Sequence, residues 1–271
     1  MDRASSIRST AAALSLVITL LWAQAAISQE EGSSIPVGTD GRTVNPVFPT
    51  YPDHALFSEP GRLQSELAYS ASFFEDPVPT VHSVFLNNML TVAELVEVRV
   101  NWRMLRAAGG DTSIGDLGLG VKGGFLGGIG ENIHLAGVFE LLLPTGDGPF
   151  SLGDGIGALA SFVASTFVST LRIDIQAGVD THIFSDNSSI DVPLAADLVW
   201  NPIDQLSVYG DFVLTLDLTN FSDSTTSLGA GAGYRFLPFM SVDATARLGL
   251  SQGLPDAEVG VSVSFLSPRF W

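Results

Sequence analysis

The chain has 271 residues, a formal net charge of −17 and no cysteine. The missing cysteine excludes disulfides and thiol chemistry, and the negative charge argues against nucleic acid as a partner. Charged residues make up only 15% of the chain, whereas soluble domains carry roughly 25%. Beyond the N-terminal segment, however, no stretch reaches the roughly 18–20 apolar residues of a membrane helix. This combination is typical of a membrane β-barrel, whose apolar residues occupy alternate positions.

Residues 1–25 have the pattern of a secretory signal peptide. Arg3 and Arg8 give a positive start, residues 11–22 are apolar, and Ala23-Gln24-Ala25 forms a cleavage box. This order predicts export by the secretion machinery, with cleavage after Ala25 or as late as Ser28. The mature chain is therefore expected in the cell envelope of a Gram-negative bacterium.

Residues 26–61 differ from the rest of the chain. They contain five prolines, at positions 36, 46, 49, 52 and 60, and show no hydrophobic period. Such a composition predicts an irregular, extended arm. Two arrangements are open: the arm lies in the periplasm, or it folds up into the barrel as a plug.

From Arg62 onward, apolar and polar residues alternate in repeated runs of about ten. In residues 172–180, for example, the odd positions Ile173, Ile175, Ala177 and Val179 are apolar. The even positions Arg172, Asp174, Gln176 and Asp180 are charged or polar. Strict alternation places each set on one face of a strand. About ten residues also suffice to cross a bilayer when a strand is tilted.

The alternation predicts an all-β protein, a transmembrane antiparallel up-and-down barrel of about twelve strands over residues 62–266, followed by a tail at 267–271. We expect the strands near 62–75, 80–90, 94–106, 115–126, 131–143, 155–165, 168–182, 191–201, 204–219, 226–237, 239–250 and 256–266. The sheet must close, because an open edge in hydrocarbon would leave backbone groups unpaired. Tight turns at 201–204 and 237–238 are expected in the periplasm. The longer connections at 107–114, 144–154, 185–190 and 220–226 are expected outside.

The polar positions of the strands predict the residues that line the lumen. The basic candidates are Arg99, Arg103, Lys122, Arg172, Arg235 and Arg247. The acidic candidates are Glu97, Asp116, Glu140, Asp174, Asp197, Asp211, Asp217 and Asp243. Charges of both signs on neighbouring strands favour cross-strand pairs. Two interpretations stay open: a polar constriction that filters solutes, or a salt-bridge ladder that fills a narrow interior.

Two segments resemble a known family, the MetA-pathway phenol-degradation outer-membrane proteins, often called transporters. They are Ser113–Lys122 (SIGDLGLGVK) and Phe139–Asp147 (FELLLPTGD), which ends in the loop Pro144, Thr145, Gly146 and Asp147. Leu228–Phe236 and Gly249–Asp256 fit the family's glycine rhythm, and residues 38–40 echo its N-terminal element without the Arg-Pro pair. The resemblance covers most of the chain after Arg62. It implies a barrel of roughly twelve strands and passage of small hydrophobic or aromatic compounds.

The C-terminal strand carries the expected signal for the barrel-assembly machinery. Val259, Val261, Val263 and Phe265 alternate as such a strand requires, and six residues follow. We take Phe265 as the assembly signal. The alternative, Trp271, would also turn Arg269 toward lipid.

No feature of the sequence indicates catalysis, a cofactor or a metal. A barrel phospholipase would need a lipid-facing Ser–His pair. His54 lies in the arm, His134 and His182 have the lumen parity, and no serine motif accompanies His82 near an outer loop. Asp147 and Asp154 are interpreted as turn residues rather than calcium ligands. The predicted protein is an outer-membrane channel for passive passage of a small-molecule solute, with membrane lipid as its surroundings. The alternatives are a plugged structural or surface-interaction barrel and, less favoured, a barrel enzyme.

Overall fold

The computed structural model describes residues 53–75, 77–125, 133–148, 151–184 and 188–271. The predicted signal peptide, its cleavage site and residues 26–52 of the arm lie outside the described residues.

Twelve long strands and one short strand make up the described sheet. They are β1 (Leu63–Phe73), β2 (Val81–Ala93), β3 (Val96–Ala108), β4 (Asp111–Ser113), β5 (Leu117–Gly124), β6 (Ile133–Leu143), β7 (Ile156–Val168), β8 (Leu171–Ile183), β9 (Ser188–Ile203), β10 (Leu206–Asp217), β11 (Thr225–Leu237), β12 (Met240–Gly249) and β13 (Ala257–Leu266). A single turn of 3-10 helix, η1 (Phe221–Asp223), lies between β10 and β11. The short β4 pairs with the far end of β3, beyond β5.

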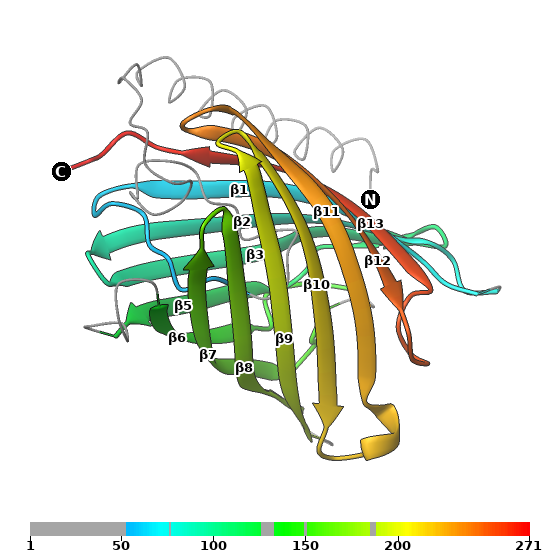
Figure 1. The fold of residues 1–271 in the computed structure, drawn as a ribbon. Helices are drawn as coiled ribbons and strands as arrows, with labels where there is room; N and C mark the ends of the chain where they lie inside the picture. The colour runs from blue at the N-terminus through cyan, green and yellow to red at the C-terminus, as the bar shows by residue number, and fades with distance from the viewer. Residues whose placement is uncertain (1–52, 76, 126–132, 149–150, 185–187) are drawn as a thin grey trace.

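The sheet closes on itself. Each long strand pairs antiparallel with the next, and β1 pairs with both β2 and β13 (Figure 1). Closure gives the backbone N–H and C=O groups of every long strand partners on both sides, as a lipid environment demands. The predicted fold, an antiparallel barrel of about twelve strands, is therefore confirmed.

Connections differ in length between the two ends of the barrel. Two residues suffice between β2 and β3, β7 and β8, β9 and β10, and β11 and β12. The registers Leu63↔Leu90 and Gln64↔Leu266 place the beginning and the end of the barrel at this same end. The connections between long strands at the opposite end are all longer than two residues, and the β5–β6 connection, residues 125–132, is the exception at the short-turn end. This is the division expected when the short turns lie in the periplasm.

One expected turn lies elsewhere. The sequence places a turn at 201–204, but β9 continues to Ile203 and the turn is Asp204–Gln205. Asn201 and Pro202 occupy a register shift, where the pairing of β9 with β10 steps from Leu206↔Ile203 to Val208↔Trp200. A β-bulge tolerates proline because the extra residue needs no ladder hydrogen bond. Similarly, β9 already begins at Ser188, so the connection expected at 185–190 is shorter.

The barrel buries its charges and exposes its apolar side chains. Lys122 and Glu66 are 0% exposed, whereas Ile175 is 54% and Leu198 49% exposed. A soluble fold shows the reverse distribution, so the outer face is suited to lipid. In the described part of the chain, no helix is both long and apolar enough to span a bilayer.

The C-terminal tail returns along the segment that precedes β1. Ser267 N–H donates to Leu63 O, and Phe270 N–H donates to Gly61 O, both at 2.8 Å. Phe265 pairs in register with Ser65 on β1 and Met240 on β12. Its role as the assembly signal stays a prediction.

We expect Phe212→Arg to impair assembly and Thr215→Arg to be tolerated. Both residues lie on β10, but Phe212 is exposed on the outer face and Thr215 has the opposite parity. An arginine near the bilayer midplane costs about 2–4 kcal/mol on the lipid face. Folding into lipid vesicles, followed by heat-dependent gel mobility, measures the folded fraction. Equal folding of the two variants would contradict the assigned faces.

Candidate functional site

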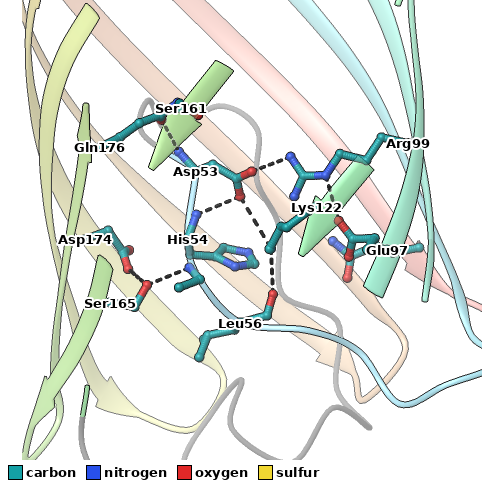
Figure 2. A network of polar contacts seen from close by, with 12 residues as sticks. Asp53, His54, Leu56, Glu97, Arg99, Lys122, Ser161, Ser165, Asp174 and Gln176 are labelled. Atoms are coloured by element: carbon teal, nitrogen blue, oxygen red, sulfur yellow. Dashed lines mark hydrogen bonds and ion pairs between the residues drawn. The ribbon is translucent and has the colours of Figure 1, made fainter. Parts of the chain in front are cut away.

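A short piece of the N-terminal arm lies inside the barrel. Asp53, His54, Ala55 and Leu56 are all buried. Figure 2 shows Asp53, His54 and Leu56 among inward-pointing side chains of the strands. Of the two arrangements open for the arm, residues 53–57 adopt the one within the lumen.

Side chains of the wall satisfy the backbone of this segment. Asp53 N–H donates to Gln176 Oε1 at 2.9 Å, and Ala55 N–H donates to Ser165 Oγ at 2.7 Å. The carbonyl of Leu56 accepts from Lys122 Nζ at 2.7 Å. A buried extended segment outside the sheet must find such partners. Three strands, β8, β7 and β5, provide them.

The carboxylate of Asp53 sits between the two basic side chains of the neighbouring wall (Figure 2). It forms an ion pair with Arg99 and lies 3.8 Å from Lys122 Nζ. Arg99 Nε also binds Glu97 Oε1 at 2.7 Å. Two cations thus meet two carboxylates. Removing one member of such a buried group leaves an uncompensated charge, which is strongly destabilising. The arm and the charged wall therefore depend on each other.

An apolar contact fixes the other side of the segment. Ala55 packs with Ala136, Val138 and Val163, and Phe57 packs against this cluster. The ring of Phe57 also lies 4.7 Å from Lys122 Nζ, a cation–π distance. Because Ala136, Val138 and Val163 share the inward parity of their strands, they interrupt the polar inner face. This interruption is a sequence signal that something apolar fills the lumen there.

A second set of inward charges lies on β8 to β12. Arg172 Nε binds Asp174 Oδ2 at 2.7 Å, and one Arg247 amino group binds Asp211 Oδ1 at 2.8 Å. Asp197 stands directly opposite Asp174 on one side and Asp211 on the other. Asp174 also accepts a hydrogen bond from Ser165. This row of aspartates is thereby joined to the arm contacts, because Ser165 binds Ala55 as well.

Two glycines let polar side chains interact across an intervening strand. Gly229 stands between Asp211 and Arg247 in register, and a Cβ on it would collide with the Asp211 carboxylate. Likewise, Asn101 Nδ2 donates to Glu140 Oε2 at 2.6 Å, and a Cβ on Gly118 would strike Glu140. On both strands the glycine supplies the space that the longer side chains need.

The remaining predicted lumen residues lie nearer the two ends or on other parts of the wall. Asp243 is buried on β12, and Arg103 is exposed on β3. Asp217 Oδ1 accepts from Thr219 N–H at 2.7 Å and therefore caps a connection. Arg235 donates to the carbonyl of Asp204 in a two-residue turn. The sequence reasoning did not select Asp53 or the fully buried Glu66 of β1, although Glu66 shares the polar parity of its strand.

Asp116 holds the loop that the resemblance singled out. Its carboxylate accepts from Gly146 N–H at 2.9 Å and from Leu152 N–H at 2.6 Å. In return, Asp147 Oδ1 accepts from Ile114 N–H at 2.9 Å, and Thr145 Oγ1 accepts from Leu117 N–H at 3.0 Å. The two most informative sequence segments therefore interlock at one end of the barrel.

Comparisons with known proteins agree on the fold. No family model and no curated protein matches the sequence. Among solved structures, an outer membrane channel from Pseudomonas putida F1 is similar with a TM-score of 0.59 at 12% identity, over 88% of this chain and 100% of that one. The NanC porin gives 0.53 at 8% identity, over 76% and 98%. The KdgM porin in complex with disordered oligogalacturonate gives 0.50 at 7%, over 74% and 98%.

These likenesses show an outer-membrane barrel fold. Together with the exposed apolar surface, they locate the chain in the outer membrane. Membership of the phenol-degradation family is not confirmed.

We expect Asp53→Asn to loosen the arm. In a Leu56→Cys background, which gives the chain its single thiol, a soluble maleimide should label the buried arm slowly. Adding Asp53→Asn should raise the labelling rate about tenfold or more, because breaking a buried charge pair costs about 3–5 kcal/mol. Asp154→Asn, on an exposed loop, is the matched control. Unchanged labelling in the Asp53→Asn variant would contradict the electrostatic attachment.

We expect Gly229→Ala to destabilise the barrel by about 1–3 kcal/mol, because it pushes Asp211 away from Arg247 and leaves buried polar groups unsatisfied. Gly210→Ala on the adjacent strand is the control, since its Cβ would have its nearest neighbour at 3.7 Å. Urea unfolding from lipid vesicles, followed by tryptophan fluorescence, measures both. If the two substitutions destabilise the barrel to a similar extent, Gly229 is not needed as space for the Asp211–Arg247 interaction.

Proposed function

We propose that the protein is an outer-membrane channel through which small solutes pass passively along the lumen. The observation that carries this proposal is the inner face itself. Ionised and hydrogen-bonding side chains line the inside of a closed barrel whose outer face is apolar. Charged groups are costly to remove from water, so an inner face that carries them on most of its strands is suited to an interior that water and polar solutes enter. The fold that it shares with a channel and two porins is consistent with this proposal.

The arm segment sets the width of the path in this proposal. Residues 53–57 lie against β3 and β5 to β8. A barrel of twelve strands has a modest bore, so a segment fixed to one side of the wall narrows it substantially. Conduction then takes place beside the arm or after its displacement.

Conductance in planar bilayers tests the proposal. The wild-type protein should give discrete current steps, and Asp53→Asn should give larger steps because its arm is held less firmly. Asp154→Asn should behave as the wild type. Bilayers that stay silent with both the wild type and Asp53→Asn would favour a plugged structural barrel instead.

The solute class is a separate proposal. The resemblance of Ser113–Lys122 and Phe139–Asp147 to phenol-degradation outer-membrane proteins supports small hydrophobic or aromatic compounds. Uptake of a small phenol into liposomes, with and without the protein, tests it against a sugar of similar size. If the protein accelerates uptake of the phenol and of the sugar equally, the channel selects solutes by size alone.

Enzymatic activity is not part of the proposal. The exposed His82 on the outer face has a tyrosine partner, because its Nδ1 lies 2.7 Å from Tyr69 Oη. A catalytic Ser–His pair would need the hydroxyl of a serine where the Tyr69 hydroxyl lies.

A further inference from the structure

Two rows of carboxylates cross the inner face of β8, β9 and β10. The inner row is Asp174, Asp197 and Asp211, and the outer row is Asp180, Asp191 and Asp217. In each row the aspartates stand directly opposite one another in the antiparallel ladder. Like charges in this position are destabilising, so the rows require compensation by positive charge.

Compensation in the inner row is incomplete. Asp174 binds Arg172, and Asp211 binds Arg247. Asp197, between them, is 2% exposed, and among the described residues no other side chain forms a hydrogen bond with either of its carboxylate oxygens. One oxygen of Asp211, Oδ2, is also without a partner there. When all three carboxylates are ionised, the two guanidinium groups leave one negative charge uncompensated, at the centre of the row.

We propose that Asp197 and Asp211 Oδ2 form a binding site for one monovalent cationic group, either an alkali-metal ion or the ammonium group of a solute. A buried carboxylate without a partner is costly, and a single positive charge neutralises the row. In the part of the chain that the structure describes, no three acidic, histidine or cysteine side chains converge as metal ligands.

The charge of the opposite wall supports the same assignment. Around the twelve strands, β3 stands opposite β10. Its Arg99, with Lys122 of the adjacent β5, is already neutralised by Asp53 and Glu97. These two cations of the opposite wall therefore leave no unpaired positive charge for the row of aspartates.

The outer row places a second group of carboxylates along the lumen. Asp191 and Asp197 are six residues apart on β9, roughly 20 Å at about 3.3 Å per residue. The outer row lies toward the end with longer connections. A cation entering from that end meets first one row and then the other. This inference rests on the proposed channel function and adds cation selectivity to it.

The reversal potential in a KCl gradient tests the selectivity. The wild-type channel should prefer potassium over chloride, and Asp197→Asn should reduce that preference about tenfold, since focused charge raises local counter-ion concentration by at least that factor. Asp154→Asn, with its carboxylate on an exposed loop, should leave the preference unchanged. Replacing potassium with methylammonium distinguishes a site for the bare ion from one that also accepts an ammonium group. A preference that is equal in the wild type and Asp197→Asn overturns the proposal.

A stability measurement tests the site without any current. The temperature at which heat-dependent gel mobility changes should rise when potassium replaces a bulky organic cation at equal ionic strength. Asp197→Asn should fold but lose this rise, whereas Asp154→Asn should retain it. A wild-type protein that is indifferent to the cation overturns the site, even where the channel conducts. A silent bilayer with a potassium-dependent rise would instead refute the channel function and keep the site.

Discussion

The pairing of backbone hydrogen bonds in a medium without water is the constraint on which the whole structure depends. Lipid offers no partner to a free N–H or C=O, so the first and last strands, β1 and β13, must meet. Closure then divides every strand into a face toward lipid and a face toward an enclosed interior. The unusual distribution of exposure follows, with Ile175 outside and Lys122 inside. The polar lumen is thus a consequence of the same constraint that makes the sheet close.

Strand positions and faces were predictable because they rest on local information. Alternation with period two assigns each side chain of a strand to a face without reference to any other part of the chain. The error at 201–204 has the same origin. The residue type of Pro202 predicts a turn, but a register shift between β9 and β10 accommodates this proline within the sheet. Such a shift depends on the pairing of two strands, which a single segment does not encode.

The position of the arm could not be predicted from local sequence patterns. Its contacts join residues far apart in the chain: 46 positions separate Asp53 from Arg99, and 123 separate it from Gln176. No periodicity marks residues 53–57, so their place inside the barrel was open. The inner face did contain a sign, because Ala136, Val138 and Val163 are apolar where polar residues were expected. The sequence predicts individual charges of the wall, but it does not indicate Asp53, which pairs with Arg99.

The space above Gly229 has a consequence for how this sequence can change over time. Asp211, Gly229 and Arg247 lie on three successive strands and serve a single interaction. A side chain at position 229 is costly while Asp211 and Arg247 both remain. Loss of either Asp211 or Arg247 leaves the other without its partner. Substitutions at the three positions are therefore coupled, so that each is acceptable only against a suitable background. Homologues that have lost the glycine should also have lost the charged pair it separates.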